Sequence, residues 1–205
     1  MKLISFIYFL AILLCSLNAI SQNTIELERF IDSEEYDKGI NYFNNNINTF
    51  KNDKYANYLL GELGLESEDW ETAKKGYESA ILLCNPNQNM NIHERINFND
   101  NEIYWASNDG LGVIYYKLGD YKKSLIALEE ANKWLSFASV KFNDEVKHLF
   151  NLACAYSLNN YFDKSVFTLK KTLELNPNYI YKIKNEQDFK SMKDYKPFIE
   201  LLNGK

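Results

Sequence analysis

A spacing of 34 residues recurs in this chain and constrains its fold more than any other feature. Each pair of positions at this spacing keeps the same kind of residue, first aromatic, then small, then aromatic. The pairs are Tyr36 with Trp70, Gly39 with Ala73, and Phe43 with Tyr77. A period of this length fits a pair of helices that cannot bury its apolar faces alone. The sequence therefore predicts stacked helix pairs.

Small residues inside the predicted helices indicate where the two helices of a pair approach each other. Glycine in a helix costs about 1 kcal/mol relative to alanine, so close packing must offset that cost. The small residues are Gly61, Gly112 and Ala153 in the first helices, and Ala73, Ser124 and Ser165 in the second. Turns are predicted at 118–120 and 158–160, because Gly and Asn accept the left-handed conformation that ends a helix.

This pattern resembles that of the tetratricopeptide repeat family over most of the chain. The resemblance implies an all-α fold, a right-handed α-solenoid of antiparallel helix pairs with about four repeats. The repeats are expected at about 22–53, 54–87, 102–138 and 143–177. The segment 178–205 resembles the closing segment of such arrays. We expect it to cap the last repeat through a turn at Asp188-Phe189 and a helix from about Pro197 to Leu202.

The period slips twice. Trp70 and Tyr121 are 51 residues apart, and Tyr121 and Phe162 are 41 apart. The first surplus falls at 87–101 and predicts an inserted loop, with an extended helix as the alternative. For the second surplus, after Trp134, an extended helix is the preferred interpretation.

Residues 1–21 have the layout of a secretory signal peptide. Lys2 precedes an apolar run, and small residues then lead to a predicted cleavage between Ser21 and Gln22. A retained membrane anchor and a lipoprotein anchored through Cys15 are the alternatives. The mature chain, 22–205, is then one domain that is periplasmic or secreted. The composition is typical of an AT-rich bacterial genome and suggests a Gram-negative cell envelope.

Charge argues against a nucleic-acid partner. The chain has 23 Lys and Arg against 28 Asp and Glu, and no basic cluster of the kind that nucleic-acid binding needs. Membrane contact is expected only if the N-terminal segment is retained or lipidated. Cys84 and Cys154 lie among apolar residues, which favours two buried thiols over a disulfide.

We find no catalytic constellation, no metal ligand set and no cofactor motif. His93 and His148 are the only histidines, 55 residues apart, and neither has neighbours that would complete a site. The sequence therefore predicts a protein that is not an enzyme.

The resemblance implies that ligands lie along a concave surface formed by the first helix of each repeat. The candidate groove residues at those positions are Tyr55, Tyr58, Glu62, Leu65, Asp109, Val113, Tyr116, Lys147 and Phe150, with Cys154 beside them. The Lys and Asn residues with which some family members grip a terminal carboxylate are absent. We expect an aromatic, mildly acidic groove that binds another protein or a peptide segment, from an envelope protein.

Three other interpretations stay open. The groove aromatics could pack between repeats, the chain could bind a small apolar molecule or lipid enclosed by 87–101, or it could be an unrecognised enzyme.

Overall fold

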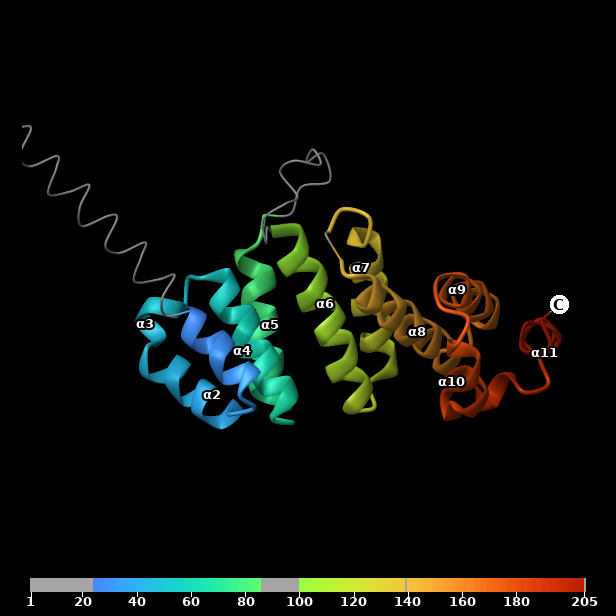
Figure 1. The fold of residues 1–205 in the computed structure, drawn as a ribbon, viewed down its shortest axis with the longest axis horizontal. Coiled ribbons are helices and arrows are strands. Elements are labelled where there is room, and N and C mark those ends of the chain that lie inside the picture. Colours follow the sequence, from blue (N-terminus) through green and yellow to red (C-terminus); the bar gives the residue numbers. More distant parts are fainter. Residues whose placement is uncertain (1–23, 86–99, 139, 205) are drawn as a thin grey trace, which may run out of the picture. The chain divides into compact units, whose positions relative to one another are not determined.

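The computed structural model describes residues 24–85, 100–138 and 140–204, and regular structure there is helical with no strand. The chain divides into two compact units, unit 1 up to Leu83 and unit 2 from Cys84 (Figure 1). The predicted signal peptide and most of the 87–101 insertion, including His93, lie outside the described residues.

Unit 1 contains a helical stretch at 24–32, followed by α2 (Tyr36–Asn45), α3 (Ile47–Phe50), α4 (Lys54–Glu66) and α5 (Trp70–Leu83). Helix α4 packs against both α2 and α5. The core of the unit is aromatic and aliphatic. Its largest members, each at most 1% exposed, are Leu27, Phe43, Phe50, Leu63 and Tyr77.

Glycines bring the backbones of α4 and α5 together. A Cβ atom on Gly64 would lie 2.3 Å from the backbone nitrogen of Ala73, and one on Gly76 would lie 2.4 Å from that of Gly61. The predicted close approach at Gly61 and Ala73 is confirmed. Gly64 and Gly76 extend this close approach along the same helix crossing. The close packing offsets the low helix propensity of the three glycines, Gly61, Gly64 and Gly76.

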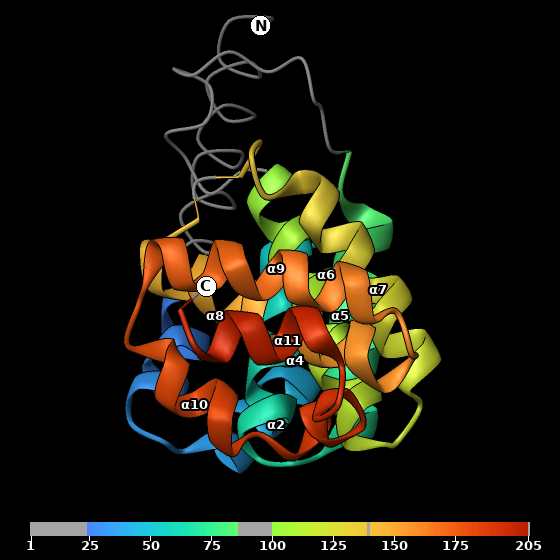
Figure 2. The ribbon, with the colours of Figure 1, turned by 90° about the vertical axis from the view of Figure 1, so that its right-hand side faces the viewer.

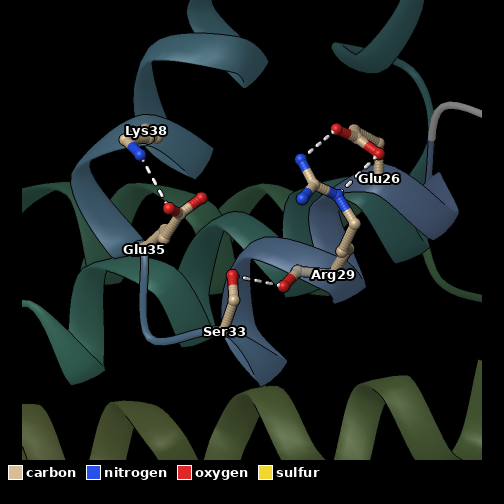
Figure 3. Close-up of polar contacts among 5 residues, drawn as sticks. All are labelled: Glu26, Arg29, Ser33, Glu35 and Lys38. Atoms are coloured by element: carbon tan, nitrogen blue, oxygen red, sulfur yellow. Dashed lines mark hydrogen bonds and ion pairs between the residues drawn. The ribbon is translucent and has the colours of Figure 1, made fainter.

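Charged side chains at the turn before α2 pair with one another at the surface. Arg29 donates to the Glu26 carboxylate from Nε at 3.0 Å and from Nη2 at 2.5 Å, and Lys38 Nζ donates to Glu35 at 2.7 Å (Figure 3). The Ser33 hydroxyl donates to the carbonyl of Arg29 at 2.8 Å. Such exposed pairs contribute little to stability, but they leave the guanidinium of Arg29 engaged within its own helix.

Unit 2 contains two long helix pairs. They are α6 (Asp100–Lys117) with α7 (Tyr121–Trp134), and α8 (Phe142–Leu158) with α9 (Phe162–Leu175). Helices α6 and α8 have 18 and 17 residues, whereas α4 has 13. The first helices of the two pairs in unit 2 are thus four to five residues longer than α4. The extended helix predicted directly after Trp134 is wrong for most of that segment: α7 ends at Trp134, residues 135–138 and 140–141 are not helical, and α8 begins only at Phe142.

Four turns in the chain share one backbone feature. The residue two positions before α2, α5, α7 and α9 has positive φ, and these residues are Glu34, Glu68, Gly119 and Asn160. The predicted left-handed turns at 118–120 and 158–160 are confirmed. Glutamate occupies the same position in unit 1, where its Cβ makes the conformation unfavourable.

The C-terminal segment folds back onto the last helix pair. It consists of α10 (Tyr179–Asn185), η2 (Gln187–Met192) and α11 (Lys196–Leu202), which pack against α8 and α9 (Figure 2). Its buried residues join the α8–α9 core and are Ile183, Phe189, Met192, Phe198 and Leu201. Helix α11 confirms the predicted last helix to within a residue, whereas α10 was not predicted.

Candidate functional site

Unit 2 contains a cavity of about 190 Å³ between its first helices and the C-terminal segment. Its apolar wall is formed by Val113 of α6, Leu128 of α7 and Phe150 of α8. Gly112 also lines the cavity, and a Cβ there would lie 2.5 Å from Cγ of Leu128. The close helix crossing predicted at Gly112 is thus confirmed, and it forms part of the cavity wall.

One hydrogen bond joins α6 to the C-terminal segment across this cavity. The hydroxyl of Tyr116 donates to Oδ1 of Asp188, 72 residues later, at 3.2 Å. Asp188 lies in η2, whose position is fixed by a second bond: the hydroxyl of Ser157 donates to the Asp188 backbone carbonyl at 2.7 Å. Phe189, the next residue, packs edge to face on Phe150 with ring centroids 5.9 Å apart. The Asp-Phe pair therefore places a carboxylate on the cavity wall and an aromatic ring in the core.

The acidic and polar groups around Asp188 influence one another's ionisation. Burial raises the pKa of Asp188, and Glu186 adds to that effect, while hydrogen bonds from Tyr116 and Cys154 offset part of it. Burial also raises the pKa of the Tyr116 hydroxyl and of the Cys154 thiol. For both groups the negative charge of Asp188 is the next cause.

Two lysines line the cavity and both are exposed. They are Lys117 at the end of α6 and Lys182 of α10. Lys182 Nζ lies 4.2 Å from the ring centroid of Phe150 and 5.5 Å from that of Tyr179, which are cation–π distances. The aromatic wall therefore already accepts a cation from the chain's own C-terminal segment.

Three of the five groove candidates in unit 2 line the cavity: Val113, Tyr116 and Phe150. Phe150 is only 3% exposed, because Tyr179 and Phe189 cover its ring, so it contributes a buried wall and does not face open solvent. Cys154, beside it on α8, is also buried and lines the cavity.

The other two candidates in unit 2 are engaged elsewhere. Asp109 Oδ1 lies 2.6 Å from Nδ1 of His148, which is fully buried and packs edge to face on Trp105. Lys147 is exposed, and its Nζ lies 3.8 Å from the carboxylate of Asp144. Neither residue lines the cavity.

The four candidates in unit 1 all lie on α4 and are half-buried. Tyr55 and Tyr58 stack with ring centroids 6.0 Å apart, and the Tyr55 hydroxyl donates to Glu28 at 2.7 Å. Glu62 accepts a hydrogen bond from the hydroxyl of Tyr77. Tyr55, Tyr58 and Glu62 thus belong to one aromatic and carboxylate cluster, while Leu65 lies a turn further along the helix.

The sequence pattern did not identify the contribution of the C-terminal segment, namely Lys182, Glu186 and Asp188. The Asp188-Phe189 pair was the signal that pointed to this segment, but it was interpreted only as part of a cap. The pair also lines the cavity through Asp188, and this depends on the packing of the C-terminal segment against α8.

Within residues 24–85, 100–138 and 140–204, no three His, Cys, Asp or Glu side chains are placed to hold a metal ion. Helices in the same described ranges are all too short or too polar to cross a membrane. Cys154 is a buried free thiol, while Cys84 is half-buried, so the expectation of two buried thiols fits Cys154 better.

A sequence model of the tetratricopeptide repeat matches residues 107–134 and 147–179, which cover parts of α6 to α10. No curated protein sequence matches the chain.

Solved structures with the same fold include two of MamA and one of YrrB. A crystal structure of MamA is 18% identical, with a TM-score of 0.57, over 85% of this chain and 80% of that one. A structure titled as the MamA RS-1 ArsTM double mutant is 14% identical, with a TM-score of 0.59, over 90% and 95% of the two chains. YrrB, described as a TPR protein with an unusual peptide-binding site, is 14% identical, with a TM-score of 0.57, over 86% and 88%.

At these identities the likeness concerns the fold, and it agrees with the all-α helical-repeat fold of the solenoid class that the sequence predicts. Together with the matched repeats and the small residues at their helix crossings, it supports a protein of the tetratricopeptide repeat family, with two repeats matched in unit 2.

Proposed function

We propose that this chain is an exported, non-catalytic scaffold of the bacterial cell envelope that holds a segment of a partner protein at the cavity of unit 2. Tetratricopeptide repeats are protein-interaction modules, and the similar structure YrrB is described as having a peptide-binding site. Export is supported by the predicted signal peptide at residues 1–21.

The observation that best supports the proposal is the cavity itself. It lies at first-helix positions, Val113 and Tyr116 of α6 and Phe150 of α8, where the family resemblance places ligands. A dry cavity of about 150 Å³ is large enough to hold a benzene ring, so one of about 190 Å³ can hold a single side chain. The geometry therefore suits one anchoring residue of an extended segment.

Size also separates this proposal from the binding of a lipid or other small apolar molecule. Sites for drug-sized ligands measure roughly 300–1,000 Å³, and an acyl chain would not be enclosed in about 190 Å³. The partner's main chain would instead remain outside, along the half-buried faces of Val113 and Tyr116.

The site also lacks the parts of a catalytic centre. The residues beside Asp188 are a tyrosine and a thiol whose pKa values are both raised, so neither is activated as a nucleophile. His148 and Asp109 form a close pair, but neither lines the cavity.

Site-specific photocrosslinking tests the proposal. A benzoylphenylalanine at position 113 should capture a discrete partner in cell-envelope extract. The same group at position 126 should not, because Ile126 is 60% exposed on α7 and does not line the cavity. Equal capture from both positions, or capture from position 126 alone, would move the binding site away from the cavity.

A further inference from the structure

Two carboxylates on the cavity wall have no cationic partner within the part of the chain that the structure describes. Glu186 accepts the backbone N–H of Gln187 at 2.9 Å, and Asp188 accepts the hydroxyl of Tyr116 at 3.2 Å. The ion pairs found among the described residues involve neither of them. A half-buried carboxylate without a cation is costly to keep.

The lysines nearby do not fill this role. Lys182 Nζ lies over the ring of Phe150 at 4.2 Å. Neither Lys182 nor Lys117 takes part in an ion pair among the described residues. The negative charges of Asp188 and Glu186 raise the pKa of the Cys154 thiol, and the positive charge of Lys182 lowers it by a smaller amount. The net effect of charge at that thiol is therefore negative.

The rest of the cavity fits an aliphatic stem. Val113, Leu128 and Phe150 line the same cavity as the carboxylates Asp188 and Glu186. A lysine or arginine side chain combines both properties, because it has an apolar stem of three or four methylene groups and a cation at its end. An acidic side chain would bring a third negative charge to Glu186 and Asp188, and a purely apolar one would leave them without a partner.

We propose, building on the function above, that the cavity binds a lysine or arginine side chain of the partner segment. The stem of that side chain lies on Phe150 and Val113, and its cation pairs with Asp188 and Glu186. Recognition of a basic residue is the reverse of the carboxylate grip whose Lys and Asn residues this sequence lacks. The C-terminal segment is then part of the binding site as well as a cap.

Selection from a displayed library of random nine-residue peptides on the purified mature chain tests this proposal. We expect one position of the selected peptides to be enriched in Lys or Arg between apolar neighbours. Asp188→Asn keeps the size of the side chain and its ability to accept from Tyr116. It should weaken binding of a selected peptide about tenfold or more, and Glu186→Gln with Asp188→Asn should weaken it further.

Asp194→Asn is the matched control, because Asp194 is 88% exposed on the same C-terminal segment and does not line the cavity. Its affinity for the peptide should stay within about twofold of the wild type. Replacing the selected Lys by norleucine should remove the difference between the wild type and Asp188→Asn.

The possible results separate this inference from the proposed function. Selected peptides that bind at the cavity but show no basic preference, or that carry an acidic residue instead, would overturn the inference and leave the scaffold function standing. If no peptide is selected at all, both fail.

Discussion

The hydroxyl of Ser124 donates a hydrogen bond of 2.7 Å to the backbone carbonyl of Gly112. Ser165 makes the same bond to the carbonyl of Ala153 at 2.8 Å, also twelve residues earlier in the chain. In both repeats of unit 2 a small residue of the first helix lets the second helix approach, and a buried serine on the second helix donates to the carbonyl of that small residue. This relation explains why glycine and serine occur inside helices, where propensity disfavours both.

The crossing at Gly112 makes a prediction for stability. Gly112→Leu should lower the free energy of unfolding by about 3 kcal/mol, because its side chain would overlap the fully packed Leu128. Lys117→Ala, on an exposed residue of the same helix, should change it by less than about 0.5 kcal/mol. Urea denaturation of the two variants measures both values. Equal stabilities would contradict the crossing.

The positive φ of Glu68 predicts a stabilising substitution. Glu68→Gly should raise the free energy of unfolding of unit 1 by about 1 kcal/mol, since glycine adopts φ of 59° without the steric cost that glutamate bears. Glu66→Gly makes the same chemical change two residues earlier, in the last turn of α4, and should be destabilising. Thermal unfolding of both variants would show opposite shifts, and a loss of stability in Glu68→Gly would contradict the backbone argument.

The hairpins were predictable from the sequence because each is specified by residues close together in the chain. The 34-residue spacing, the small residues at 61, 112 and 153, and the turn residues Gly119 and Asn160 are local signals. They fix helix faces and turns without reference to the rest of the fold.

The candidate site was predictable only in part, because it depends on a distant contact. Val113 and Tyr116 could be placed on the ligand-facing side of α6 from helical spacing. The carboxylate of Asp188 reaches Tyr116 from 72 residues away, and no periodicity encodes that return of the chain. The same return explains why Phe150, expected to face a groove, is covered by Tyr179 and Phe189.

The raised pKa of Asp188 predicts how stability depends on pH. Its pKa in the folded state lies above the unfolded value, so ionised Asp188 destabilises the fold at neutral pH, and this penalty disappears as the pH falls below the unfolded pKa of about 4. Asp188→Asn should therefore be more stable than the wild type at pH 7, and the difference should shrink toward pH 4. Urea denaturation at the two pH values tests this. A less stable variant at pH 7 would show that the carboxylate serves the fold.

The N-terminal 21 residues predict processing on export. Expressed with its own leader in a Gram-negative host, the protein should be recovered from the periplasm with a mass that begins at or near Gln22. Intact mass spectrometry distinguishes the alternatives. Retention of Met1 in the membrane fraction would indicate an anchor, and a diacylglycerol on Cys15 would indicate a lipoprotein.

The central claim, that the cavity of unit 2 takes a side chain of a partner segment, is tested most directly by methyl NMR. A peptide selected by the wild-type chain would be titrated into protein labelled at Val, Leu and Ile methyl groups. We expect the resonances of Val113 and Leu128, which line the cavity, to shift in proportion to occupancy, while Ile126 on the exposed side of α7 stays unchanged. Shifts at Ile126 with none at Val113 and Leu128 would contradict the account.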